Sequence, residues 1–217
     1  MLDFYGTVVH EDDPVADEIC DVISRTSPGD PAPAAIATYW SDAFCSACGQ
    51  SFGPSFQNQR TLELGSLEDT VHRFRSDCDP FELADKLFDR WQRPPLFEDA
   101  RRFLARVGLP VVVVSNIDRR DIEAAIGHHD LVFDGVFTSE DLRAYKPRSE
   151  PFEAAMAALG TRRVLHVGDS QSSDVLGASE LGLAVAWVNR KGVPATDGPS
   201  PDHQVRDLEE LLPILLG

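Results

Sequence analysis

The stretch Val111-Val112-Val113-Val114-Ser115-Asn116 sets four β-branched residues in a row and ends on two polar ones. A short, continuous apolar run of this kind is typical of a strand buried on both faces. The surrounding sequence repeats the alternation, with apolar runs at 132–137, 164–167 and 184–188 and helical patterns at 97–107, 119–126, 150–159 and 173–181. Repeated units of strand and helix specify a parallel sheet covered by helices on both faces. The sequence therefore predicts an α/β, Rossmann-like core.

The segment upstream of this pattern is helical. From Pro14 to Trp91 the apolar residues recur at helical spacing, and no strand pattern interrupts them. We predict that residues 1–13 and 92–217 form the α/β core domain and that residues 14–91 form an inserted all-helical cap domain. Only Met1 and Leu2 precede Asp3 in the first expected strand, although strands usually run about five residues. Either this strand is unusually short or the sequence begins late.

Composition and charge argue against several classes of function. The chain has 217 residues, a 42% apolar fraction and a formal net charge of −16, which argue for a soluble globular protein that does not bind nucleic acid. No apolar run suits a membrane span and no signal-peptide layout is present, so we expect a cytoplasmic location and no membrane partner. An acidic protein with an anionic substrate must neutralise charge locally, through a cation or a lysine. The sequence has three lysines, Lys86, Lys146 and Lys191.

Polar groups follow the expected strand ends in four places. These are Asp3 to Thr7, Ser115-Asn116, Lys146-Pro147, and Gly168-Asp169-Ser170 with Asp174. Singly, such residues are ordinary helix caps, turn formers or surface charges. Ligands of open α/β sheets bind beyond the carboxyl ends of the strands. The four groups together therefore predict one site.

This set resembles the four motifs of the haloacid dehalogenase superfamily, and the likeness covers nearly the whole chain. That family contains mostly phosphatases, together with dehalogenases and a few carbon–phosphorus hydrolases. Its first motif is Asp followed by x-x-Gly-Thr, its second a Ser or Thr, its third a Lys and its fourth an acidic loop. They correspond here to Asp3 to Thr7, Ser115, Lys146, and Asp169 with Asp174. The helical insertion resembles the family's common cap.

The resemblance implies a role for each residue. Asp3 would be the covalent nucleophile, which splits one hard displacement into two easier steps. A Mg²⁺ cofactor would be held by oxygen donors of Asp3, the Tyr5 carbonyl and Asp169, with Asp174 as a ligand or a nearby partner. Ser115, Asn116 and Lys146 would hold the phosphate oxygens. Thr7 would orient Asp3 or contact phosphate.

The motifs also depart from the family's phosphatases. Those enzymes usually carry a second Asp two residues after the nucleophile, whereas this chain has Tyr5 and so resembles the dehalogenases, whose first motif is D-x-Y-G-T. Asp169 favours the phosphatases, because dehalogenases have a Ser there. The cap also lacks a match to the dehalogenases' Arg, since Ser41 follows Trp40, and Phe152 stands where they have a Tyr. We predict a Mg²⁺-dependent phosphatase of small organic phosphates, with a metal-independent 2-haloacid dehalogenase as the alternative.

Two further hypotheses about the function have less support from the sequence. A non-catalytic binding module of the same fold has no need for the charged set of Asp3, Lys146, Asp169 and Asp174. A carbon–phosphorus hydrolase should have a lysine early in the cap, but the only cap lysine is Lys86, near its end. Cap residues would choose the small-molecule substrate, and the candidates are Trp40, Phe44, Gln57, Asn58, Arg60 and His72. The sequence assigns no oligomeric state.

Overall fold

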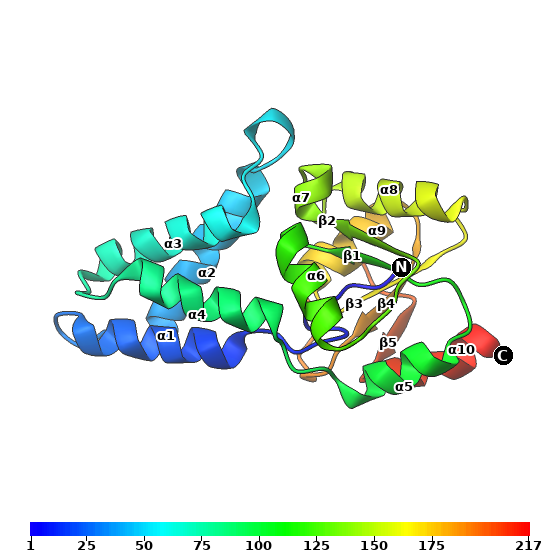
Figure 1. Cartoon of the computed structure of the whole chain (residues 1–217), viewed down its shortest axis with the longest axis horizontal. Coiled ribbons are helices and arrows are strands. Elements are labelled where there is room, and N and C mark those ends of the chain that lie inside the picture. The colour runs from blue at the N-terminus through cyan, green and yellow to red at the C-terminus, as the bar shows by residue number, and fades with distance from the viewer.

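The computed structural model describes residues 1–217 and contains one parallel sheet flanked by helices, with a helical cap at one side (Figure 1). The strands are β1 (Val112–Ser115), β2 (Gly135–Thr138), β3 (Leu165–Gly168), β4 (Ala184–Val188) and β5 (His203–Val205). The helices of the core are α5 (Glu98–Arg106), α6 (Arg119–His128), α7 (Ser139–Leu142), α8 (Ser149–Leu159), the turn η2 (Gln171–Val175), α9 (Leu176–Glu180), η3 (Leu208–Leu211) and α10 (Leu212–Leu216). The predicted fold class is confirmed.

Leu2 joins the two halves of the sheet. Leu2 forms a parallel β-bridge to Val113 of β1 on one side and another to Val167 of β3 on the other. β1 also pairs with β2, and β4 pairs with β3 and β5, so the order is β2-β1-Leu2-β3-β4-β5. The first strand is therefore reduced to the bridges of a single residue. This position sends Asp3 out at the carboxyl end of the sheet, between β1 and β3.

The core forms on both faces of the sheet because alternate residues of a strand point to opposite sides. Val113 packs with Phe103 of α5 and Ile122 of α6, whereas Val112 and Val114 pack on the opposite face. The second face is covered by α8 and α9, which supply Phe152, Ala155 and Ala178. Figure 1 shows α8 and α5 on opposite sides of the sheet.

The cap consists of helices α1 (Asp13–Thr26), α2 (Pro33–Gln50), α3 (Gln59–Phe74) and α4 (Pro80–Gln92), with the short turn η1 (Gly53–Ser55). Pro stands in the first turn of α1, α2 and α4, where its missing N–H costs no hydrogen bond. The cap helices end within one residue of the predicted domain boundaries, and the boundaries themselves stay a prediction. No helix of the chain is both long enough and apolar enough to span a membrane.

The cap is fastened to the core at the start of α3. Asp118, just before α6, accepts the backbone N–H groups of Gln59 at 2.7 Å and Arg60 at 3.1 Å. The guanidinium of Arg60 also donates to both oxygens of the fully buried Asp121. Backbone donors at a helix start need acceptors, and Asp118 supplies them from the other domain.

Two predicted elements need correction. The strand predicted at 132–137 begins only at Gly135, because Val132 is exposed and Asp134 turns back to accept the Val111 N–H at 2.7 Å. The helix predicted at 173–181 is a π-helical turn at Gln171–Val175 followed by α9. The short strand β5 and the C-terminal helix α10 were not predicted.

Candidate active site

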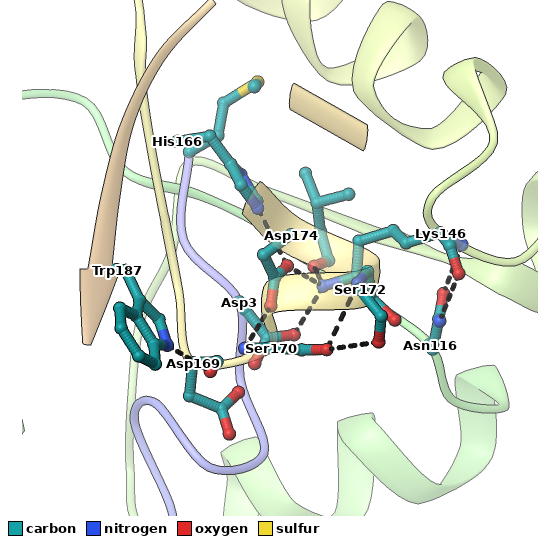
Figure 2. Close-up of polar contacts among 12 residues, drawn as sticks. Asp3, Asn116, Lys146, His166, Asp169, Ser170, Ser172, Asp174 and Trp187 are labelled. Atoms are coloured by element: carbon teal, nitrogen blue, oxygen red, sulfur yellow. Dashed lines mark hydrogen bonds and ion pairs between the residues drawn. The ribbon is translucent and has the colours of Figure 1, made fainter. Parts of the chain in front are cut away.

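Three of the predicted side chains meet at the carboxyl end of the sheet (Figure 2). Lys146 Nζ donates to Asp3 Oδ1 at 2.7 Å, to Asp174 Oδ1 at 2.6 Å and to the Val114 carbonyl at 2.9 Å. Asp3 and Lys146 are 5% exposed and Asp174 is 1% exposed. Buried charges persist only when they are paired, so Lys146 fixes both carboxylates.

Burial and ion pairing shift the pKa values of this cluster in opposite directions. Burial raises the pKa of Asp3 to about 6, while Lys146 opposes the shift and Asp174 adds to it. Burial would also raise the pKa of Asp174, but Lys146 and His166 outweigh it and bring that pKa below its usual value. Burial alone would lower the pKa of Lys146, yet Asp174 and Asp3 raise it. At neutral pH an ammonium therefore lies between two carboxylates.

Two glycines let the acids approach the backbone. Gly6 has φ of 82°, and a Cβ there would lie 2.4 Å from Asp169 Oδ2. A Cβ at Gly168 would lie 2.2 Å from the carboxyl carbon of Asp174. Any larger residue would displace a carboxylate of the site, so the glycines are required for the approach and not only for the turn.

Asp169 differs from the other two acids of the cluster in its hydrogen bonds. Its backbone carbonyl accepts the Trp187 indole N–H at 2.7 Å, but its carboxylate accepts no hydrogen bond from the chain. Burial raises the pKa of Asp169 well above its usual value, and the charges of Asp3 and Asp174 add to the shift. Its carboxylate is thus free to accept a proton donor or a cation.

The acids form a donor set that fits a hard cation. Asp3, Asp169 and Asp174 each offer one carboxylate oxygen, and these atoms lie within 4.8 Å of one another. The ammonium of Lys146 bonds to Asp3 and Asp174 but not to Asp169, and oxygen donors are those that Mg²⁺ takes. The residues therefore fit the predicted Mg²⁺, whose binding stays a prediction.

Asn116, in the second motif, supports the backbone of Lys146, in the third motif. Asn116 Oδ1 accepts the Lys146 N–H at 2.7 Å, and its Nδ2 donates to the Lys146 carbonyl at 3.1 Å. Asn116 thereby holds the backbone that carries the lysine. The hydroxyl of Ser115 lies at the end of β1 and forms no hydrogen bond within the chain. The buried hydroxyl of Thr7 also has no partner, so it does not hydrogen-bond to Asp3.

Tyr5 turns its hydroxyl away from the reacting cluster. The hydroxyl donates to the Trp91 carbonyl at 2.6 Å, at the end of the cap. Burial raises the pKa of Tyr5 well above its usual value, and Asp121, Asp12 and Asp3 add to the shift. The phenol is therefore a neutral structural donor, and its side chain supplies no proton beside Asp3.

The six cap residues predicted to choose the substrate divide into two groups. Trp40 and Phe44 line a cavity inside the cap. The other four serve elsewhere: Arg60 pairs with Asp121, Asn58 caps α3 by accepting the Thr61 N–H, the Gln57 carbonyl accepts the Tyr145 hydroxyl, and His72 lies in the last turn of α3.

His166 is a residue of the site that the sequence analysis does not predict. Its Nε2 lies 2.8 Å from Asp174 Oδ1, and the ring is fully buried. Burial lowers the pKa of His166 to about 4, so the neutral ring donates its Nε2–H to the carboxylate. The available signal was a single polar residue inside the apolar run at 164–167.

Comparison with known proteins gives relatives of two kinds. The chain is 35% identical over 122 residues to (S)-2-haloacid dehalogenase H-109 of Pseudomonas putida, which covers 54% of each protein. It is 34% identical over 140 residues to a phosphoserine phosphatase of Thermus thermophilus, covering 60% of this chain and 55% of the relative. The chain thus matches about half the length of these relatives. Several further matches are (S)-2-haloacid dehalogenases.

Solved structures show the same fold. The L-2-haloacid dehalogenase of Xanthobacter autotrophicus superposes with a TM-score of 0.77 over 100% of this chain and 97% of the other, at 22% identity. Identity this low carries the fold alone.

These relatives correct the predicted function. The prediction of a Mg²⁺-dependent phosphatase depends on Asp169 with Asp174, on the missing cap Arg and on Phe152, but the relatives matched in sequence are mostly (S)-2-haloacid dehalogenases. The preference for a phosphate ester as substrate is unsupported for the same reason. The prediction of a phosphatase is therefore wrong, and the relatives support the dehalogenase alternative, which Tyr5 indicates in the sequence.

Family membership rests on a longer match. The model of the haloacid dehalogenase-like hydrolases aligns with residues 1–182, which include every motif residue of the site. A non-catalytic module is therefore the wrong description, and the chain belongs to the haloacid dehalogenase-like hydrolase family.

Proposed function

We propose that the protein hydrolyses small 2-haloacids, with Asp3 as the nucleophile. The observation that carries this proposal is the pairing of a buried, lysine-held Asp3 with a Tyr5 hydroxyl that is committed to the Trp91 carbonyl. A halide departs without a proton, whereas an alkoxide leaving group needs a general acid. The first motif thus suits carbon–halogen cleavage.

The reaction has two steps. An oxygen of Asp3 attacks the carbon that bears the halogen, the carbon–halogen bond breaks, and halide leaves an ester on Asp3. Water then attacks the ester carbonyl, which restores the Asp3 carboxylate and releases a 2-hydroxyacid and a proton. Asp169 suits the second step, because its carboxylate lies beside Asp3 and is free to accept a hydrogen bond from the water. No step requires a metal.

An anionic substrate needs a positive neighbour that is not already neutralised. A cavity of about 280 Å³ is lined at one end by Gly6 and Asp169, and also by Arg90. Arg90 donates to the Glu11 carbonyl but forms no ion pair. We assign the substrate carboxylate to this side of the site, within reach of Asp3.

The test is halide release from (S)- and (R)-2-chloropropionate, measured with EDTA and with added Mg²⁺. We expect release from one enantiomer at equal rates under both conditions. In a single turnover in ¹⁸O-water, the label should enter Asp3 and not the hydroxyacid, because water attacks the carboxyl carbon of the ester. Label in the first-turnover product, or no halide release from any 2-haloacid, would refute the proposal. A cytoplasmic location and a small-molecule partner are part of the same proposal.

A further inference from the structure

The cap contains a second cavity of about 570 Å³ with an unusual lining. The rings of Trp40, Phe44 and Trp91 form its apolar walls. Its charged residues are all acids: Glu11, Asp12, Asp13, Asp17 and Glu63. No lysine, arginine or histidine lines it.

Glu63 is the central feature of this cavity. The residue is 7% exposed, it lines the cavity from α3, and its carboxyl group takes part in no ion pair. The nearest indole, Trp40, donates its N–H to Ser66 Oγ at 3.1 Å. A buried carboxylate without a counter-ion is unfavourable, because burial removes the water that would solvate its charge. The cavity therefore presents an acceptor that a ligand can satisfy.

Most of the other acids already have partners. Asp12 accepts the Trp91 indole N–H at 2.6 Å, and Lys191 donates to Glu11 and Asp13, both at 2.6 Å. These contacts hold the rim of the cavity. Among the acids of the lining, Glu63 is the buried one, and it forms no ion pair.

We propose that the cap cavity binds an organic ammonium ion, with Glu63 as its counter-ion and the faces of Trp40, Phe44 and Trp91 as its walls. Aromatic faces attract a cation through their quadrupole, and the attraction is largest for tryptophan and for desolvated cations. An anion would be repelled by the acids, and a neutral apolar ligand would leave Glu63 unpaired. An ammonium with apolar substituents satisfies both parts of the lining.

The cavity adjoins the active site. It shares Glu11 and Asp13 with the smaller cavity that reaches Gly6 and Asp169. A bound ammonium would therefore lie close to a molecule reacting at Asp3. Binding at this site does not depend on the proposed dehalogenation, and it can be measured without turnover.

The test is calorimetric titration of the full chain at pH 8.5 with choline and with 3,3-dimethylbutan-1-ol, its neutral isostere. We expect choline to bind about tenfold more tightly than the alcohol, in line with cation–π and charge pairing at a desolvated site. Glu63→Gln keeps the shape and removes the charge, so it should weaken choline about tenfold and leave the alcohol unchanged. Glu68→Gln is the matched control, because it removes an exposed charge from the same helix.

Trp40→Phe gives a second measurement, should Glu63→Gln fail to fold. It keeps a smaller ring in the wall and should weaken choline about threefold. Equal affinity for the two probes, no heat from either, or an equal loss in Glu68→Gln and Glu63→Gln would each overturn the proposal.

Discussion

At the residue scale, Lys146 determines the charge of the site. The sequence predicted that Asp3, Lys146 and Asp174 would meet, because each follows a strand end in one parallel sheet. It did not predict the inner support of His166, since a single buried histidine in a strand carries no pattern. Nor does residue type decide the reaction, because a carboxylate at position 169 suits a metal ligand and a water acceptor equally well.

Asp3→Asn should abolish halide release while the protein stays folded. The amide retains an oxygen that accepts the Lys146 hydrogen bond, but it lacks the nucleophilic charge. Loss of a nucleophile commonly lowers kcat by about 10³-fold or more. Steady-state halide release and circular dichroism are the measurements. A folded variant with more than a tenth of the original activity would remove Asp3 from this role.

Asp169→Asn should separate the two steps of the reaction. Attack by Asp3 is retained, whereas ester hydrolysis slows because the amide is a weak proton acceptor. Rapid mixing should show a burst of about one halide per enzyme followed by slow turnover, and intact mass should reveal the ester. Asp197→Asn, in an exposed loop, is the control. Absence of a burst with unchanged turnover would contradict the role of Asp169.

Glu63 makes stability depend on pH. Burial raises the pKa of Glu63 from its usual 4.5 to about 8, so the folded protein holds this proton more tightly than the unfolded chain. Its contribution is fully present below pH 4.5 and is lost as pH rises to about 8. Glu63→Gln should therefore match the original protein in urea unfolding at pH 5 and be more stable at pH 8.5 by about 2–4 kcal/mol. A constant difference at both pH values would contradict this account.

At the scale of elements, continuous apolar runs make the central strands predictable. A strand at the edge of the sheet has exposed residues and therefore shows no such run. β1 is buried throughout, and the predicted run differs from the observed strand by one residue at each end. β5 has only three residues, of which Gln204 is exposed and only Val205 is buried, so it carries no pattern. The turn at Gln171–Val175 departs from an α-helix because the Val175 N–H donates to the Ser170 carbonyl, five residues earlier, at 3.1 Å.

The contact between α3 and α6 should contribute strongly to stability. Arg60 reaches across from the cap to Asp121, which is fully buried. Arg60→Met would leave that carboxylate with only the more distant Arg120 as its cation, at 3.8 Å. It should cost about 2–3 kcal/mol, below the usual figure for a fully buried pair because Arg60 is partly exposed. Urea unfolding of Arg60→Met, Asp121→Asn and the double variant gives the coupling. Additive losses in the double variant would show that the pair is not coupled.

At the scale of the whole molecule, a net charge of −16 faces a substrate of the same sign. The charge pattern along the chain predicted a local positive group, and Lys146 lies in the site, but it is already shared by two carboxylates. Which basic side chains remain free depends on folded contacts such as those of Arg90, and no spacing in the sequence reveals them. The long-range field and the local site therefore act in opposite directions on an anion.

Ionic strength should separate these two effects. Salt screens charges that lie more than about 8 Å apart at 0.15 M, so it weakens the repulsion of the whole molecule more than the short contacts inside the site. Raising sodium sulfate from 10 to 150 mM ionic strength should increase kcat/KM for 2-chloropropionate about two- to fivefold and leave kcat unchanged. Sulfate adds no halide, so product inhibition does not interfere. The neutral 2-chloropropionamide is the matched substrate, and its kcat/KM should not respond. A fall in kcat/KM for the acid alone would mean that the basic groups beside the site, Arg90 among them, dominate the approach of the substrate.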